Sequence, residues 1–290
     1  VNGLSGVINY ADWWEYDPAS DSWTQKANYP TVNYGAISFA AAGKGYVGGG
    51  AFLGSEFYSF NPVTNTWTAI QNCPGSPGDQ GCFAVGDKGY VFVGAAVYEY
   101  NAITGNWTTK QNGPAFGGWC VAFSIGTSGY VKNGAVLYEY KPLYDQWLVR
   151  AAFPGMNTNG GAALARNGKG YIISGFVGSL NIVTPEVWEY NPGNNTWLRL
   201  NDFPGTDRRF STAFCINGKG YFGTGTNGLN FNDFWEMNDG VGIDELDAKS
   251  EVVVYPQPAT EYVNISLKNY TMGTDATLRL FNTQGQCIQT

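Results

Sequence analysis

Histidine does not occur anywhere in this chain of 290 residues. Its absence excludes the serine, histidine and acid type of catalytic triad, histidine-ligated zinc and copper sites, and a histidine general base. Any catalysis in this sequence would have to use carboxylate, Tyr, Lys, Arg or Cys side chains. We therefore expect no metal site and no cofactor.

Charged residues are also scarce. They make up 13% of the chain, and the formal net charge is −7. Such a mildly acidic sequence offers nothing that attracts nucleic acid or an anionic membrane surface. We expect no nucleic acid partner and no transmembrane segment. The sequence also has no initiator Met and no signal peptide, which we interpret as a fragment of a longer precursor.

The five cysteines do not form a disulfide framework, because their number is odd and no CxxC motif occurs. Cys82, Cys120 and Cys215 occupy positions that elsewhere in the repeats hold small residues. Their alternation predicts one face of a strand where two sheets approach closely, so we interpret them as small apolar packing residues. Cys73 and Cys82 are close enough in sequence to form a disulfide bond, but we favour the packing interpretation.

A repeat is the strongest feature that is present. An aromatic residue is followed seven positions later by a tryptophan, and a turn-forming cluster lies between the two. This recurs every 40 to 50 residues, a period that indicates a repeat architecture. The five pairs are Tyr16 and Trp23, Phe60 and Trp67, Tyr100 and Trp107, Tyr140 and Trp147, and Tyr190 and Trp197.

Each repeat contains four strand-like pieces, which we call strands a to d. Strand a alternates large and small residues, as in 121–125, and strand b opens with a Gly-Tyr pair. Strand c places a glutamate between aromatics, and strand d carries the tryptophan. Alternation and turn residues favour strands over helices, and no helical stretch is evident.

Units of four strands that cannot bury both faces alone pack radially as the blades of a propeller. The repeat resembles the kelch repeat, which has a glycine pair followed by Tyr and Trp. The pair is intact only at Gly49-Gly50, so the copies are divergent. We predict an all-β fold with a six-bladed kelch-type β-propeller over residues 1–239, whose first blade lacks strands a and b and whose last blade lacks strand d.

The tail after this region has a different character. Residues 240–250 are polar and predict a linker. Residues 251–290 contain the run VVVYPQPATEYVNISL, which starts at Val252, and resemble the C-terminal sorting domain of proteins exported by the type IX secretion system of Bacteroidota. The resemblance implies an incomplete immunoglobulin-like β-sandwich, the type IX machinery as a partner, and a place outside the cell or on its surface. The alternative is an ordinary secreted β-domain.

Function is expected in the loops, because the strands only build the scaffold. The loops between strands b and c are long in blades five and six and in the first blade, which are neighbours in a closed ring. Aromatic and amide groups there would suit a sugar ring, although packing of the loops explains them equally well. The predicted ligand-binding residues are Phe176, Asn181, Asn230, Phe231 and Tyr10.

Asp207, Arg208 and Arg209 form a second candidate site, since they include the chain's one adjacent arginine pair. Two guanidinium groups could bind the carboxylate of an acidic sugar, but surface ion pairs explain most such sequences. The glutamate of strand c recurs in all blades but the second, so we interpret it as part of the scaffold.

Three functions remain open at this stage. We favour a secreted or surface-exposed module without catalytic activity that binds a glycan or a surface protein. The alternative is a carbohydrate-active enzyme of the sugar mutarotase type, and a third possibility is a structural surface-layer repeat. The resemblance to kelch proteins does not decide between them, because fold does not imply function.

Overall fold

The computed structural model describes residues 4–5, 8–237, 251–255, 264–268, 280–281 and 287–289. The chain divides into two compact units, Val1–Asn238 and Asp239–Thr290. The predicted linker at 240–250 and the YPQPA motif from Pro256 onward lie outside the described residues.

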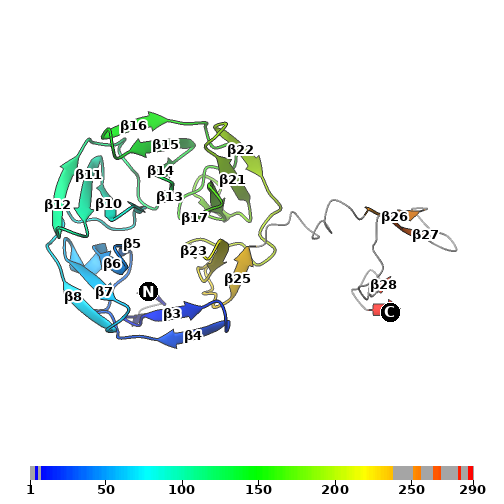
Figure 1. Ribbon diagram of the computed structural model, residues 1–290, viewed down its shortest axis with the longest axis horizontal. Coiled ribbons are helices and arrows are strands. Elements are labelled where there is room, and N and C mark those ends of the chain that lie inside the picture. The colour runs from blue at the N-terminus through cyan, green and yellow to red at the C-terminus, as the bar shows by residue number, and fades with distance from the viewer. Residues whose placement is uncertain are drawn as a thin grey trace. The chain divides into compact units, whose positions relative to one another are not determined.

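The first unit is a β-propeller whose sheets stand around a common centre (Figure 1). Every sheet is antiparallel, and neighbouring strands follow one another in the chain except where a small hairpin intervenes. The four-stranded blades are β5 (Ile37–Ala41), β6 (Lys44–Gly48), β7 (Phe57–Asn61) and β8 (Thr66–Ala69); β9 (Phe83–Val85), β10 (Lys88–Val93), β11 (Ala96–Asn101) and β12 (Asn106–Lys110); β13 (Val121–Ile125), β14 (Ser128–Asn133), β15 (Val136–Lys141) and β16 (Gln146–Val149); and β17 (Ala162–Arg166), β18 (Lys169–Ile173), β21 (Val187–Asn191) and β22 (Thr196–Arg199). A three-stranded blade follows, with β23 (Thr212–Ile216), β24 (Lys219–Gly223) and β25 (Phe234–Met237).

The number of blades differs from the prediction of six. The structure has five blades, and the predicted first blade is a two-stranded sheet of β3 (Trp14–Asp17) and β4 (Ser22–Gln25). This sheet lies between β8 and β25 in the ring (Figure 1). The Tyr16 ring lies 5.3 Å from that of Tyr221, and the Trp13 ring lies 4.9 Å from that of Trp67. Aromatic packing on both sides therefore bridges the last blade and β5–β8.

The aromatic repeat joins each blade to the one before it. The Tyr190 hydroxyl donates to Asn195 Oδ1 at 2.8 Å, and the same oxygen accepts the Ala151 N–H at 2.9 Å. Trp197 Nε1 donates to the Ala151 carbonyl at 3.0 Å, and its ring packs on Tyr190. The spacing of five and seven residues thus places a turn acceptor and an indole donor opposite the N–H and the carbonyl of one residue of the preceding blade. The indole bond recurs from Trp67 to Ala27, Trp107 to Gln71 and Trp147 to Gln111.

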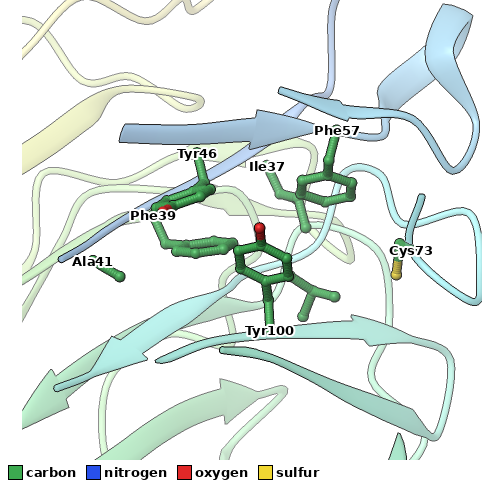
Figure 2. Packing of buried hydrophobic residues seen from close by; sticks show 8 residues of the cluster. Ile37, Phe39, Ala41, Tyr46, Phe57, Cys73 and Tyr100 are labelled. Carbon is green, nitrogen blue, oxygen red and sulfur yellow. The ribbon is translucent and has the colours of Figure 1, made fainter. Parts of the chain in front are cut away.

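The core lies between blades and consists of aromatic and aliphatic side chains. In β5 the alternate residues Ile37, Phe39 and Ala41 are buried, as the period-two pattern of a half-buried strand requires. Tyr100 of the next blade reaches this layer beside Phe39 (Figure 2). Each blade therefore completes the core of its neighbour, which explains why one repeat alone could not bury its apolar face.

The glycine of the Gly-Tyr pair receives a phenylalanine from strand a of the preceding blade. A methyl group at Gly129 would overlap the Phe83 ring, and one at Gly170 would overlap Phe123. Gly45 is different, because among the described residues the β3–β4 sheet includes no strand a that could supply a ring. Its nearest neighbour would be Phe60 Cβ, at an ordinary 3.8 Å.

Gly129→Ala should lower the free energy of unfolding by about 1–3 kcal/mol, because Phe83 must leave its packed position. Gly45→Ala is the matched control at the same repeat position and should change stability by less than about 0.5 kcal/mol. Urea unfolding of both variants measures the difference. Equal losses at the two positions would contradict this explanation of the glycine.

The strand c glutamates make structural contacts. Glu99 accepts a hydrogen bond from the Tyr90 hydroxyl at 2.8 Å and pairs with Lys88 at 2.7 Å. These bonds join strands b and c within a blade. Glu189 with Tyr171 and Lys169, and Glu236 with Tyr221 and Lys219, repeat this arrangement. Glu139 bonds to Tyr130 of strand b in the same way, but its lysine partner Lys141 lies on strand c itself.

Cys73, Cys82, Cys120 and Cys215, the cysteines whose side chains the structure describes, form no disulfide bond. Burial raises the pKa of the Cys73 thiol to about 11 and that of Cys82 to about 12, which makes both poor nucleophiles at neutral pH. Cys120 is buried as well, whereas Cys215 is exposed. The packing interpretation therefore fits Cys120 and Cys82 but not Cys215.

A few short elements complete the described structure. Against the expectation of no helix, α1 (Gly50–Leu53) lies in the loop between β6 and β7. The hairpin β19 (Phe176–Val177) and β20 (Ile182–Val183) lies between β18 and β21, and β1 (Leu4–Ser5) pairs with β2 (Ile8–Asn9). In the second unit β26 (Glu251–Tyr255) pairs with β27 (Asn264–Lys268), and β28 (Leu280–Phe281) pairs with β29 (Cys287–Gln289).

Candidate functional site

One face of the propeller holds the connections into strand a together with the loops between strands b and c. Five residues at the entry to strand a have positive φ angles between 53° and 66°. From the second residue onward, the backbone amide of each donates to the carbonyl of its counterpart in the preceding blade, at 2.8–2.9 Å in three of the four bonds. We call these residues the inner ring: Gly35, Asp79, Trp119, Gly160 and Phe210.

Trp119 and Phe210 are unusual members of the inner ring. Bulky residues rarely adopt the left-handed conformation, which is typical of glycine. Both side chains are also exposed, at 44% and 43%, and their ring centroids lie 5.3 Å apart. Gly160 lies directly against the Phe210 ring, since a methyl group at Gly160 would come within 2.7 Å of it. Strained residues of this kind concentrate at ligand sites, which makes this pair the starting point of a candidate site.

Arg209 extends the pair into a larger cluster. Its guanidinium carbon lies 4.4 Å from the Phe176 ring centroid and 5.1 Å from that of Phe210. The peptide groups of Phe176 and Asn159 exchange two hydrogen bonds of 2.8 and 2.9 Å, which fixes Phe176 beside the inner ring. We call Trp119, Phe176, Arg209 and Phe210 the aromatic platform.

Arg208, in contrast, is a core residue. Its side chain is 0% exposed, forms two bonds to the Asp233 carboxylate, and donates to the Thr206 and Thr224 carbonyls at 2.8 and 3.1 Å. Its guanidinium also lies 4.2 Å from the ring centroid of Phe231. The predicted arginine pair is therefore divided, with one member inside the protein and the other at its surface.

The other predicted residues are spread over this part of the propeller. Asn181 is exposed in the β19–β20 hairpin, and Asn230 is exposed and forms a backbone bridge to Thr226. The backbone carbonyl of Tyr10 accepts a hydrogen bond from the backbone N–H of Asn33 at 3.4 Å, so Tyr10 lies beside blade β5–β8. Asp207 is half-buried, and burial together with the negative charge of Asp202 raises the pKa of its carboxyl.

The sequence therefore led to Phe176 and Arg209 but not to Trp119 or Phe210. The predicted binding residues came from loops whose length differs between blades. Trp119 and Phe210 lie instead in the connection between strand d of one blade and strand a of the next, whose length is nearly constant. A signal was present, because Trp119 is a tryptophan outside strand d and follows Gly117-Gly118. The direction of an exposed side chain, however, depends on the positive φ angle, which no pattern in the sequence specified.

Comparison with known proteins addresses the tail and the fold separately. Residues 253–290 match the family of secretion system C-terminal sorting domains. This chain is an exported β-propeller protein. The sorting domain of the exported propeller is of the type IX kind, which indicates export to the cell surface or the extracellular space. No curated protein matches the chain.

The propeller fold has a solved counterpart. The structure of YjhT matches with a TM-score of 0.68 and 15% sequence identity, covering 91% of this chain and 96% of that one. At this identity the likeness establishes the fold and carries no information about the ligand. Within the residues that the structure describes, no helix of the exported propeller is long and apolar enough to cross a bilayer.

Proposed function

We propose that the exported propeller is a carbohydrate-binding module whose site is the aromatic platform. The observation that carries the proposal is the pair of exposed rings at Trp119 and Phe210, held in the left-handed conformation on the loop-rich face. Aromatic faces stack on the apolar side of a sugar ring, while directional hydrogen bonds bind its hydroxyls.

Arg209 supplies the polar part of the proposed site. Two rings hold its guanidinium, and among the described residues no carboxylate is recorded within ion-pair distance of it. Its N–H groups can therefore donate to sugar oxygens without breaking an existing ion pair. Stacked and pre-oriented, the group loses little conformational freedom when a ligand binds.

The mutarotase alternative loses one of the residues on which it depended. Arg208 is enclosed between Phe203, Phe222 and Phe231 and is bound to Asp233, so it cannot reach a ligand at the surface. Asp207 and Arg209 remain on that side of the propeller. No arrangement of an acid facing a base over a common reacting atom favours catalysis in this cluster.

Trp119→Ala should weaken glycan binding at least about tenfold, because a central stacking ring is removed. The full chain is applied to an array of oligosaccharides and polysaccharides, and the affinity for the strongest ligand is then measured by calorimetry. Tyr144→Ala serves as the control, since this 71% exposed tyrosine lies in the turn between β15 and β16, away from the strand a entries.

Two results would contradict the proposal. One is the absence of binding to any glycan on the array, and the other is equal binding by Trp119→Ala and the unchanged protein. Phe231 is unsuitable for this test because its ring packs on the buried Arg208, so its removal would disturb the fold.

A further inference from the structure

A second exposed aromatic pair lies on the same face, on blade β5–β8. Tyr34 and Phe52 are 37% and 56% exposed, and their ring centroids are 5.7 Å apart in an edge-to-face arrangement. Tyr34 immediately precedes Gly35 of the inner ring, and Phe52 belongs to α1. Neither residue was among those expected to bind a ligand. We call the two residues the second platform.

A buried asparagine holds the second platform in place. Asn33 is 0% exposed, and its Oδ1 accepts the backbone N–H groups of Tyr34 at 3.0 Å and Phe52 at 3.3 Å. Its Nδ2 donates to the Gly49 carbonyl at 2.8 Å, and the Ala51 amide donates to the Tyr34 carbonyl at 3.0 Å. A buried amide held by three hydrogen bonds is a rigid support for the backbone that carries the two exposed rings.

The inner ring connects the two platforms. The Asp79 amide donates to the Gly35 carbonyl at 2.9 Å, and the Trp119 amide donates to the Asp79 carbonyl. Two such steps place the backbones of Gly35 and Trp119 roughly 10 Å apart, from the spacing of hydrogen-bonded neighbours. Asp79 is exposed between them and offers carboxylate oxygens that can accept hydrogen bonds from sugar hydroxyls.

From this arrangement we propose that the exported propeller binds a chain of several sugars, with one part of the chain on the aromatic platform and another on the second platform. The inference rests on the proposed function and extends it from a single stacking site to two subsites. A single sugar ring is too short to reach both aromatic pairs. An oligosaccharide that occupies both sites gains contacts without a second loss of translational freedom.

The test measures affinity against chain length in the full-length chain. Cello-, chito-, xylo- and galacturono-oligosaccharides are titrated from monosaccharide to hexasaccharide by calorimetry. For a ladder that binds, we expect affinity to rise at least about tenfold from the shortest ligand to the longest. Phe52→Ala should remove this rise and leave the affinity for the shortest ligand unchanged, whereas Trp119→Ala should weaken every length.

The outcomes separate this inference from the proposed function. Binding that does not depend on length, or a Phe52→Ala variant that keeps the full rise, would overturn the second subsite and leave the glycan site standing. An equal loss at all lengths in Phe52→Ala would also overturn it, because the two platforms would then be one site. If no oligosaccharide binds at all, both proposals fail. Tyr144→Ala is the exposed aromatic control, and thermal unfolding verifies that each variant is folded.

Discussion

Arg208→Ala should lower the free energy of unfolding by about 3 kcal/mol. The wild-type guanidinium is 0% exposed and bonds to Asp233 and two backbone carbonyls, so its removal leaves acceptors unpaired and a void between three phenylalanine rings. Breaking a buried ion pair costs about 3–5 kcal/mol. We expect the lower end of that range, because the Asp233 side chain is 37% exposed and water can solvate it after the change.

Arg209→Ala is the matched control for this prediction. It removes the same side chain from the adjacent position, but Arg209 contributes stacking on two rings and no recorded ion pair. Its free energy of unfolding should change by less than about 1 kcal/mol. Urea unfolding of both variants measures the contrast. Similar stabilities for the two variants would show that the division of the arginine pair into a core and a surface residue is wrong.

Lys132 should make the stability of the exported propeller rise with pH in the alkaline range. Its side chain is 1% exposed, its Nζ donates to the Thr158 carbonyl at 2.7 Å, and it lies 4.6 Å from the Phe153 ring centroid. Burial lowers the pKa of this amine from 10.5 to about 8. Between these two values the unfolded chain binds a proton that the folded protein has released, so raising the pH favours the folded state.

Comparison with Lys132→Met isolates this effect from other titrating groups. From pH 7 to pH 10, the free energy of unfolding of the wild type should gain about 2 kcal/mol relative to the variant. Methionine has a similar length, and the aligned residues Phe92 and Ile173 of other blades are apolar and buried. The measurement is urea unfolding at a series of pH values. Parallel stability profiles for the two proteins would exclude a depressed lysine pKa.

The tail was predictable because its sequence motif corresponds to a known domain. The segment that begins at Val252 resembles a sorting domain by its order of residues, and residues 253–290 match that family. The propeller was predictable for a physical reason. Asn195 and Trp197 both bond to Ala151 of the preceding blade, and Tyr190 bonds to Asn195, so the fixed spacing of these three residues within the repeat reflects a fixed geometry.

The blade count was not predictable in the same way. The aromatic and tryptophan strands of 14–17 and 22–25 have the repeat pattern, yet without two further strands they form a sheet of two and not a blade. Gly45 reflects this difference, because no phenylalanine of a strand a overlaps a methyl group there and the nearest ring atom is Trp13 Cζ2, at an ordinary 3.9 Å. The sequence predicts that strands a and b are missing from this unit, and the described residues form only the remaining pair there; the difference is that two strands do not make a blade.

By itself the sequence determined the all-β architecture, the export signal, and the absence of histidine chemistry, because each depends on residue identity and spacing along the chain. The tertiary structure decided which side chains reach the surface. Arg208 and Arg209 are adjacent in sequence but face opposite environments, and Trp119, Phe210, Tyr34 and Phe52 come from four separate segments. Positive φ angles at Trp119 and Phe210 and the packing of neighbouring blades bring these residues to one face.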